Sequence, residues 1–192
     1  FRSIFGMVDH MLAGMDAAHR EVTPSHVNII LRNLASGDLV EELRGIPGVQ
    51  SIDPVNQITI RYKLNANGKW ALGTLVQRDY AKQVHDVVSL REGSWPARGS
   101  FAIERLSAVH WNVASGAKVI FDVEGAEEQR SIDGRIRHPF VQPPRFGGQA
   151  HFFTDAEGLE KFGIPAGMYG QLLLRVDNYS LERSKEVAAA VR

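Results

Sequence analysis

The chain has 192 residues, with 22 basic and 22 acidic side chains and no cysteine, so it can form neither a disulfide framework nor a cysteine-based zinc site. Its formal net charge is zero, which argues against nucleic acid as the main partner, because a neutral chain has no electrostatic attraction for a polyanion. Its hydrophobic content of 44% is ordinary for a globular domain, and no run of about 20 apolar residues is present that could span a bilayer.

Residues 1–20 are predicted to form an amphipathic, stalk-like helix. Their apolar side chains recur at helical spacing and fall on one stripe: Phe1, Ile4, Phe5, Val8, Met11, Leu12 and Met15. Such a stripe either packs on the chain's own core or continues a membrane helix and contacts a partner helix. Because the chain has no initiator methionine and stops within the helical pattern of 186–192, we expect it to be a piece of a longer protein.

Residues 21–89 have the pattern of a β-α-β unit followed by a β-hairpin. Ser36 or Asp38 is suited to cap the helix of this unit. We expect an interruption at Asp53-Pro54, between the strands of residues 49–52 and 57–64. The expected strands are 26–32, 49–52, 57–64 and 70–77.

Residues 90–164 are richer in short strands. A turn is expected over 90–96 and a short helix over 106–111. Thr154 is expected to cap a second helix, with Glu157 completing a capping box. The expected strands are 101–104, 118–123, 129–137 and 149–153, and the tail adds a buried strand at 170–176 and a helix capped by Ser180.

The seven histidines do not form a metal-binding pattern. His10 and His19 are nine residues apart on one helix, too far to share an ion directly. The remaining candidates, His110, His138 and His151, lie on separate expected elements. The sequence therefore predicts no metal site.

Ser115 and Lys118 match a Ser-x-x-Lys motif of penicillin-binding enzymes. That motif needs its serine at a helix N-terminus with the lysine one turn further on, whereas here a glycine follows the serine and a strand follows the lysine. We therefore expect no catalytic residue, no cofactor-binding residue and no cofactor. We also expect no buried set of nucleophile, base and orienting group.

Several segments carry a recognisable order of motifs. Leu43–Val49 has the pattern Leu-x-x-x-Pro-Gly-Val, and Leu90–Pro96 has Leu-x-x-Gly-x-x-Pro. Ile103–Leu106 reads as a strand-to-helix junction, Val113–Val119 as a glycine turn before a strand, and Ile132–Ile136 as a strand with a glycine inside it. In order and spacing, these segments resemble the extracytoplasmic domain of ABC transporter permeases of the MacB/FtsX type.

The resemblance implies an α+β fold with two lobes. One would be a membrane-proximal β-α-β sandwich lobe of residues 21–89 and 165–192, and the other an inserted, mostly-β outer lobe of residues 90–164. The domain would lie at the bacterial cell membrane, on its periplasmic or extracellular side. Its implied function is to relay ATP-driven transmembrane motion to a periplasmic substrate or partner protein. It would not be an enzyme, because the ATPase is a separate cytoplasmic subunit or domain.

The resemblance also implies the partners. The stripe on residues 1–20 would contact the transmembrane helices of the same permease or a second permease chain, and the outer lobe would contact a periplasmic adaptor or cargo protein. Two other functions stay open. A free periplasmic ligand-binding module would need a deep pocket with converging polar groups, and a hydrolase would need a nucleophile–base pair.

Overall fold

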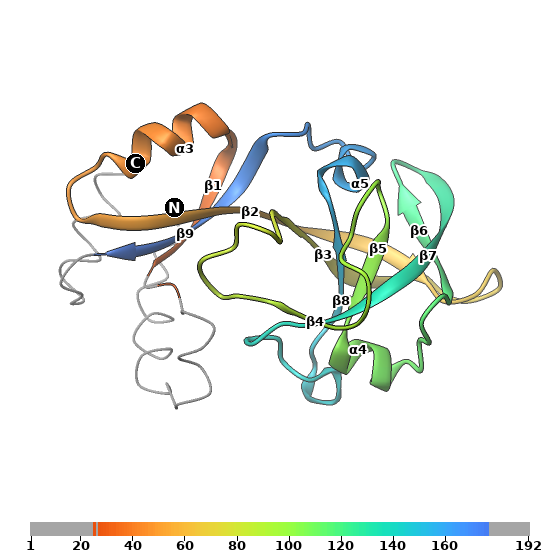
Figure 1. Ribbon diagram of the computed structural model, residues 1–192. Coiled ribbons are helices and arrows are strands. Elements are labelled where there is room, and N and C mark those ends of the chain that lie inside the picture. Colours follow the sequence, from red (N-terminus) through yellow and green to blue (C-terminus); the bar gives the residue numbers. More distant parts are fainter. Residues whose placement is uncertain (1–24, 26, 177–192) are drawn as a thin grey trace. The chain divides into compact units, whose positions relative to one another are not determined.

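The computed structural model describes residues 25 and 27–176 of the chain (Figure 1). The predicted helices over residues 1–20 and after Ser180 lie outside these described residues. The described residues belong to two compact units: unit 1 holds 25, 27–55, 81–87 and 167–176, and unit 2 holds 56–80 and 88–166. Among the helices described, none has the length and apolar character needed to cross a membrane.

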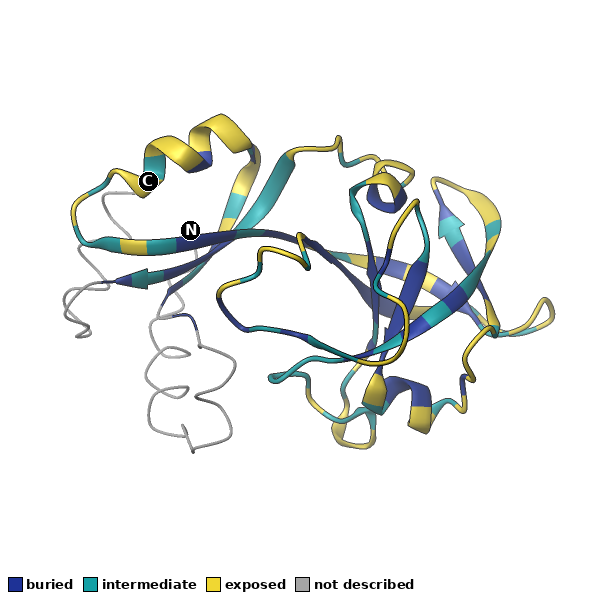
Figure 2. Cartoon of the chain, viewed as in Figure 1, coloured by how far each residue is buried: buried dark blue, intermediate teal, exposed yellow. Residues whose placement is uncertain are grey.

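Unit 1 is a three-stranded antiparallel sheet with one helix. Its last strand, β9 (Met168–Val176), lies between β1 (Val27–Ser36) and the first half of β2 (Val49–Lys63), and it is antiparallel to both. The buried strand predicted at 170–176 is thus part of β9, and it pairs with both strands of the predicted β-α-β unit. The helix α3 (Gly37–Arg44) joins β1 to β2 and is mostly exposed, as Figure 2 shows.

The core of unit 1 forms where α3 meets the sheet. Val40 of α3 is 1% exposed and packs in one cluster with Ile52 of β2 and Leu174 of β9. The Ser36 side chain accepts a hydrogen bond from the backbone nitrogen of Leu39 (3.2 Å), so Ser36 is the N-cap of α3. The first of the two N-cap candidates is thereby confirmed.

The predicted interruption at Asp53-Pro54 is wrong, because β2 runs without a break from Val49 to Lys63. Pro54 keeps its place in the strand, opposite Leu172 of β9. The second half of β2 belongs to unit 2. Residues 56–80, which the sequence grouped with the lobe of 21–89, are thus part of unit 2.

Unit 2 is built on a sheet that closes on itself. The strands pair in the order β2, β3, β8, β5, β7, β6 and back to β2, and β4 adds to β7 outside this circuit. We call this arrangement the closed sheet. The elements of unit 2 after β2 are β3 (Ala71–Arg78), β4 (Ser89–Gly93), β5 (Phe101–Glu104), α4 (Arg105–His110), β6 (Lys118–Val123), β7 (Ala126–Arg137), η1 (Pro144–Phe146), β8 (Ala150–Thr154) and α5 (Ala156–Glu160).

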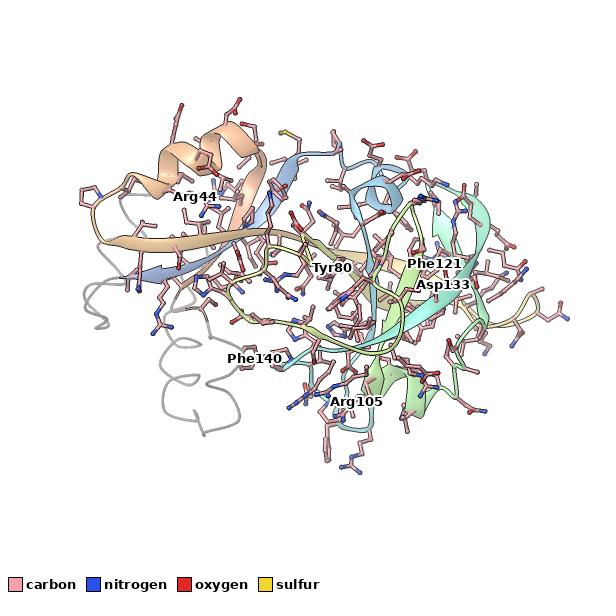
Figure 3. The ribbon with its side chains drawn as sticks, in the orientation of Figure 1. Arg44, Tyr80, Arg105, Phe121, Asp133 and Phe140 are labelled. Atoms are coloured by element: carbon pink, nitrogen blue, oxygen red, sulfur yellow. The ribbon has the colours of Figure 1, made fainter. Side chains whose placement is uncertain are left out.

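Each strand of the closed sheet contributes to one main core cluster. Phe121 lies on β6 in this cluster (Figure 3). Its ring stacks on that of Phe101 of β5 with centroids 4.9 Å apart, and its centroid lies 5.1 Å from that of Phe152 of β8, in an edge-to-face contact. Burying one such side chain stabilises the fold by about 1.5–3 kcal/mol. Because side chains alternate along a strand, the next residues face the other way. Ala102 and Phe153 accordingly join a second cluster.

Two further sequence predictions need correction. Residues 90–93 of the predicted turn at 90–96 lie in strand β4, which pairs with β7. The N-cap of α5 is Asp155, not Thr154: Asp155 Oδ1 accepts the backbone N–H of Gly158 (2.9 Å). Thr154 ends strand β8, and its hydroxyl donates instead to the carbonyl oxygen of Ser100 (3.0 Å).

Candidate functional site

The candidate site is a groove on unit 2 between α4 and the segment of residues 138–149, which joins β7 to β8. The short helix η1 lies in this segment and contacts α4 (Figure 1). The groove, which we call the α4 groove, has a volume of about 460 Å³. Its lining residues are Arg105, Leu106, Val109, His110, Pro143, Pro144 and Arg145.

One wall of the groove is fixed by Glu104, the residue that precedes α4. Its side chain is 1% exposed, and its Oε2 accepts hydrogen bonds from the backbone nitrogens of Leu106 (2.5 Å) and Ser107 (3.3 Å). These N–H groups have no partner inside the helix, so Glu104 acts as the N-cap. Ser107 Oγ in turn accepts the backbone N–H of His151 on β8 (3.1 Å). The helix is thereby held to the closed sheet.

The other wall, the 138–149 segment, is tied down by its own hydrogen bonds. The backbone nitrogen of His138 donates to Oε1 of Glu104 (3.4 Å). One carboxylate therefore accepts hydrogen bonds from both walls of the groove. The backbone nitrogen of Phe140 donates to Nδ1 of His138 (3.1 Å), which requires that nitrogen to be unprotonated. Further along, Nε2 of Gln142 donates to the carbonyl oxygen of Phe146 (2.9 Å).

Two histidines support the groove without lining it. The rings of His138 and His151 are 6.5 Å apart. The pKa of His138 is lowered to about 3, chiefly by burial and in addition by the neighbouring His151 and Arg78. Burial also lowers the pKa of His151, against the opposite effect of its hydrogen bond to the carbonyl oxygen of Gln149. Both rings are therefore neutral at pH 7.

The surface of the groove combines apolar side chains with cations. Val109 and the adjacent Phe146 are 69% and 63% exposed. Arg105, at the start of α4 (Figure 3), is exposed, and so is Arg145, whose guanidinium lies 4.9 Å from the ring centre of Phe146. Among the described residues that line the groove, none is acidic. Such a surface is suited to non-covalent binding of an anionic, partly apolar ligand.

The residues singled out in the sequence do not form this groove, apart from His110. The seven apolar stripe residues, Phe1 to Met15, lie outside the described residues, as do His10 and His19. Ser115 is exposed in the turn before β6, and Lys118 is the first residue of that strand, so the serine is not at a helix N-terminus. Across residues 27–176 and residue 25, no group of three or more histidine or acidic side chains could hold a metal ion.

Unit 1 contains a hydroxyl–imidazole pair that the sequence did not predict. Ser51 Oγ lies 2.5 Å from Nε2 of His85, whose side chain is fully buried. Beside it, Oδ2 of Asp53 accepts two backbone N–H groups of the 81–87 segment at 2.5 and 2.6 Å. This pair is two groups rather than the buried set of nucleophile, base and orienting group whose absence the sequence predicts, so that absence stays a prediction. Because His85 has no exposed surface, the pair is suited to holding the 81–87 segment on β2.

Comparison with known proteins gives a result at the level of the fold. No protein-family model matches the chain, and no curated protein matches its sequence. The chain is similar to the extracellular domain of the noncanonic ABC-type transporter YknZ from Gram-positive bacteria, with a TM-score of 0.52 and 10% identity over 83% of this chain and 86% of that one. It is also similar to the periplasmic region of MacB from Actinobacillus actinomycetemcomitans, with a TM-score of 0.53 and 10% identity over 83% of this chain and 73% of that one. The predicted α+β fold and the predicted likeness to this type of domain are confirmed.

Proposed function

We propose that the chain is the extracytoplasmic domain of an ABC transporter permease at the bacterial cell membrane. In this function it relays ATP-driven motion of the transmembrane helices to a periplasmic substrate or partner protein. The chain itself performs no catalysis, and the ATPase is a separate cytoplasmic subunit or domain. The proposal is supported by the fold, which is that of extracytoplasmic domains of two ABC-type transporters.

The observation that carries the proposal is the path of the chain through unit 1. The start of β1 pairs with the end of β9, since Val27 is opposite Leu174. Val176, the last residue of β9, is opposite Val49 on the other side. The chain therefore enters and leaves the sheet of unit 1 at the same end. A domain inserted between two membrane helices needs this arrangement, because both of its connections must reach one membrane surface.

We propose the apolar stripe of residues 1–20 as the contact with the membrane part of the transporter. On the helix predicted for residues 1–20, seven apolar side chains would form more apolar surface than an isolated solvated helix would carry. The partner is a transmembrane helix of the same permease or a second permease chain. The outer lobe would then contact a periplasmic adaptor or cargo protein.

The side of the membrane can be tested by cysteine labelling, because the chain has no cysteine of its own. Ser115→Cys places a thiol at an exposed turn of unit 2. In the full-length protein, freed of any other cysteine, we expect a membrane-impermeant maleimide to label this variant in intact spheroplasts.

Ser107→Cys is the matched control, because Ser107 is 0% exposed and its thiol should react only after denaturation. Labelling of Ser115→Cys only after the spheroplasts are lysed would place the domain on the cytoplasmic side. That outcome would contradict the proposed function.

A further inference from the structure

We propose that the α4 groove is a docking site for an acidic segment of a partner protein, in which apolar side chains are flanked by carboxylates. The inference names the chemistry of the partner that the outer lobe contacts, and it rests on the proposed function for the claim that this partner is a periplasmic protein. The groove itself lies wholly within unit 2.

The first argument is charge. The chain as a whole is neutral, yet the groove is lined by Arg105, Arg145 and His110 and by no acidic residue among those described. The carboxylate of Glu104, the residue before α4, is buried and occupied by backbone N–H groups of α4 and of His138. The arginines are therefore not neutralised by this neighbour. Arginine presents a planar set of donors that matches a carboxylate.

The second argument is the apolar surface between the cations. Leu106, Val109, Pro143 and Pro144 line the groove, and Phe146 adjoins it. Val109 and Phe146 are among the most exposed large apolar side chains of the described residues. Covering a side chain of this kind stabilises a complex, because apolar surface is removed from water. An acidic segment without apolar side chains would leave this surface uncovered.

The third argument is openness, which favours a segment of a protein over a small molecule. Pockets for small molecules bury most of the ligand surface. Here Arg105, Val109, His110 and Arg145, four of the seven lining residues, are exposed. A ligand the size of an amino acid would stay largely in water. A protein segment brings further surface that can cover the edge of the groove and exclude water.

The fourth argument is that the groove is formed in advance. The carboxylate of Glu104 bonds to both walls, and the 138–149 segment is closed by the bonds within it. Little ordering is then needed when a partner binds, which lowers the entropic cost of association.

The test is peptide binding to the 192-residue chain, measured by fluorescence anisotropy. The probe is a fluorescein-labelled peptide Glu-Asp-Leu-Phe-Asp-Glu. Two control peptides carry serine in place of leucine and phenylalanine, or lysine in place of the acids. We expect the probe to bind, and we expect both control peptides to bind at least about tenfold more weakly, since charge and apolar surface act together.

Charge reversal locates the binding on the protein. The variant Arg105→Glu/Arg145→Glu should weaken the affinity for the probe by about tenfold or more. Its matched control is Arg91→Glu/Lys118→Glu, which makes the same change in net charge at two exposed positions of unit 2 outside the groove. The control should bind within about twofold of the parent chain. Thermal unfolding should be the same for both variants, because all four side chains are exposed.

Three results would overturn the inference: no binding of the probe, an equal loss of affinity in both variants, or displacement of the probe by decanoate at lower concentration than by unlabelled peptide. The last result would indicate a site for small anionic amphiphiles. None of these results bears on the labelling of Ser115→Cys, so a failed docking site and a failed membrane assignment can be distinguished.

Discussion

At the scale of single residues, His138 links the structure of the groove to pH. Its backbone bonds to Glu104, and its Nδ1 accepts the N–H of Phe140. Burial lowers its pKa to about 3, so the ring is neutral in the folded state. In the unfolded chain a histidine has a pKa of about 6.5. Between these two pH values the unfolded chain binds one more proton than the folded chain does.

This difference predicts a loss of stability on acidification. Because protonation favours the unfolded chain, the free energy of unfolding should fall by about 1–2 kcal/mol from this residue alone as the pH drops from 7 to 5. The variant His138→Asn keeps an acceptor near Phe140 but does not titrate, so its stability should fall less over the same range. Urea unfolding at pH 5, 6 and 7 measures the effect. If the free energy of unfolding fell equally with pH in the parent chain and in the variant, this prediction would be contradicted.

The helix caps show what a local pattern can and cannot reveal. Ser36 was predictable, because a serine before a helical pattern is a local signal. Asp155 replaces Thr154 as a cap because the hydroxyl of Thr154 is already bonded to Ser100, which lies far away in the sequence. Glu104 could not be found in this way, since an acid at the end of a strand becomes a cap only when the fold buries it.

At the scale of elements, the contact between β4 and β7 depends on two glycines. Gly93 is opposite Gly134. A Cβ at Gly134 would collide with the carbonyl oxygen of Ser94, and one at Gly93 would collide with that of Asp133. Gly93 also has a φ of 73°, a conformation that other residues rarely adopt. The backbones of the two strands therefore approach more closely than side chains would allow.

This close approach predicts the effect of a single methyl group. Gly134→Ala should lower the free energy of unfolding by about 2–3 kcal/mol, because the backbone of β4 must move to relieve the collision. Gly37→Ala is the control, since a Cβ at Gly37 meets no atom within 4 Å. It should leave stability unchanged within about 0.5 kcal/mol. Chemical denaturation measures the free energy of unfolding of both variants. Similar values for the two would show that β4 and β7 do not need to approach this closely.

Most strands of unit 2 were predictable as short apolar segments separated by turn residues, but the closed sheet was not. It depends on pairings between distant segments, such as the parallel pair β3 and β8 and the short contact of β2 with β6. The apolar pattern of a strand predicts which of its residues are buried, but it does not predict which other strand pairs with it. The sequence did not reveal the α4 groove for the same reason. Arg105 and Arg145 line one groove only because the 138–149 segment folds back on α4.

At the scale of the whole molecule, the proposed relay can be tested through the apolar stripe. Ile4→Glu and Val8→Glu each place a charge on the stripe. In the complete transporter we expect the pair of substitutions to abolish transport-coupled stimulation of the ATPase, because a charged helix face cannot pack against an apolar partner.

Residues 21–192 should remain folded in this variant, which circular dichroism of the isolated chain can check. The charge-neutral pair Ile4→Leu and Val8→Ile is the control and should retain stimulation. Normal transport by the glutamate variant would show that the first 20 residues act only as a linker.

The central position of β9 in unit 1 has a consequence for how the protein is made. The strand is flanked by β1 and β2, and Gln171 on β9 bonds to Asn28 on β1 (2.6 Å) although they are 143 residues apart in the sequence. During synthesis the N-terminal part of the chain emerges first. Strands β1 and β2 therefore emerge before β9, the strand with which both of them pair. The closed sheet needs only residues 56–166, all of which emerge earlier. We therefore expect a fixed order of events in which unit 2 folds first and unit 1 is completed last, after almost the entire described chain has emerged.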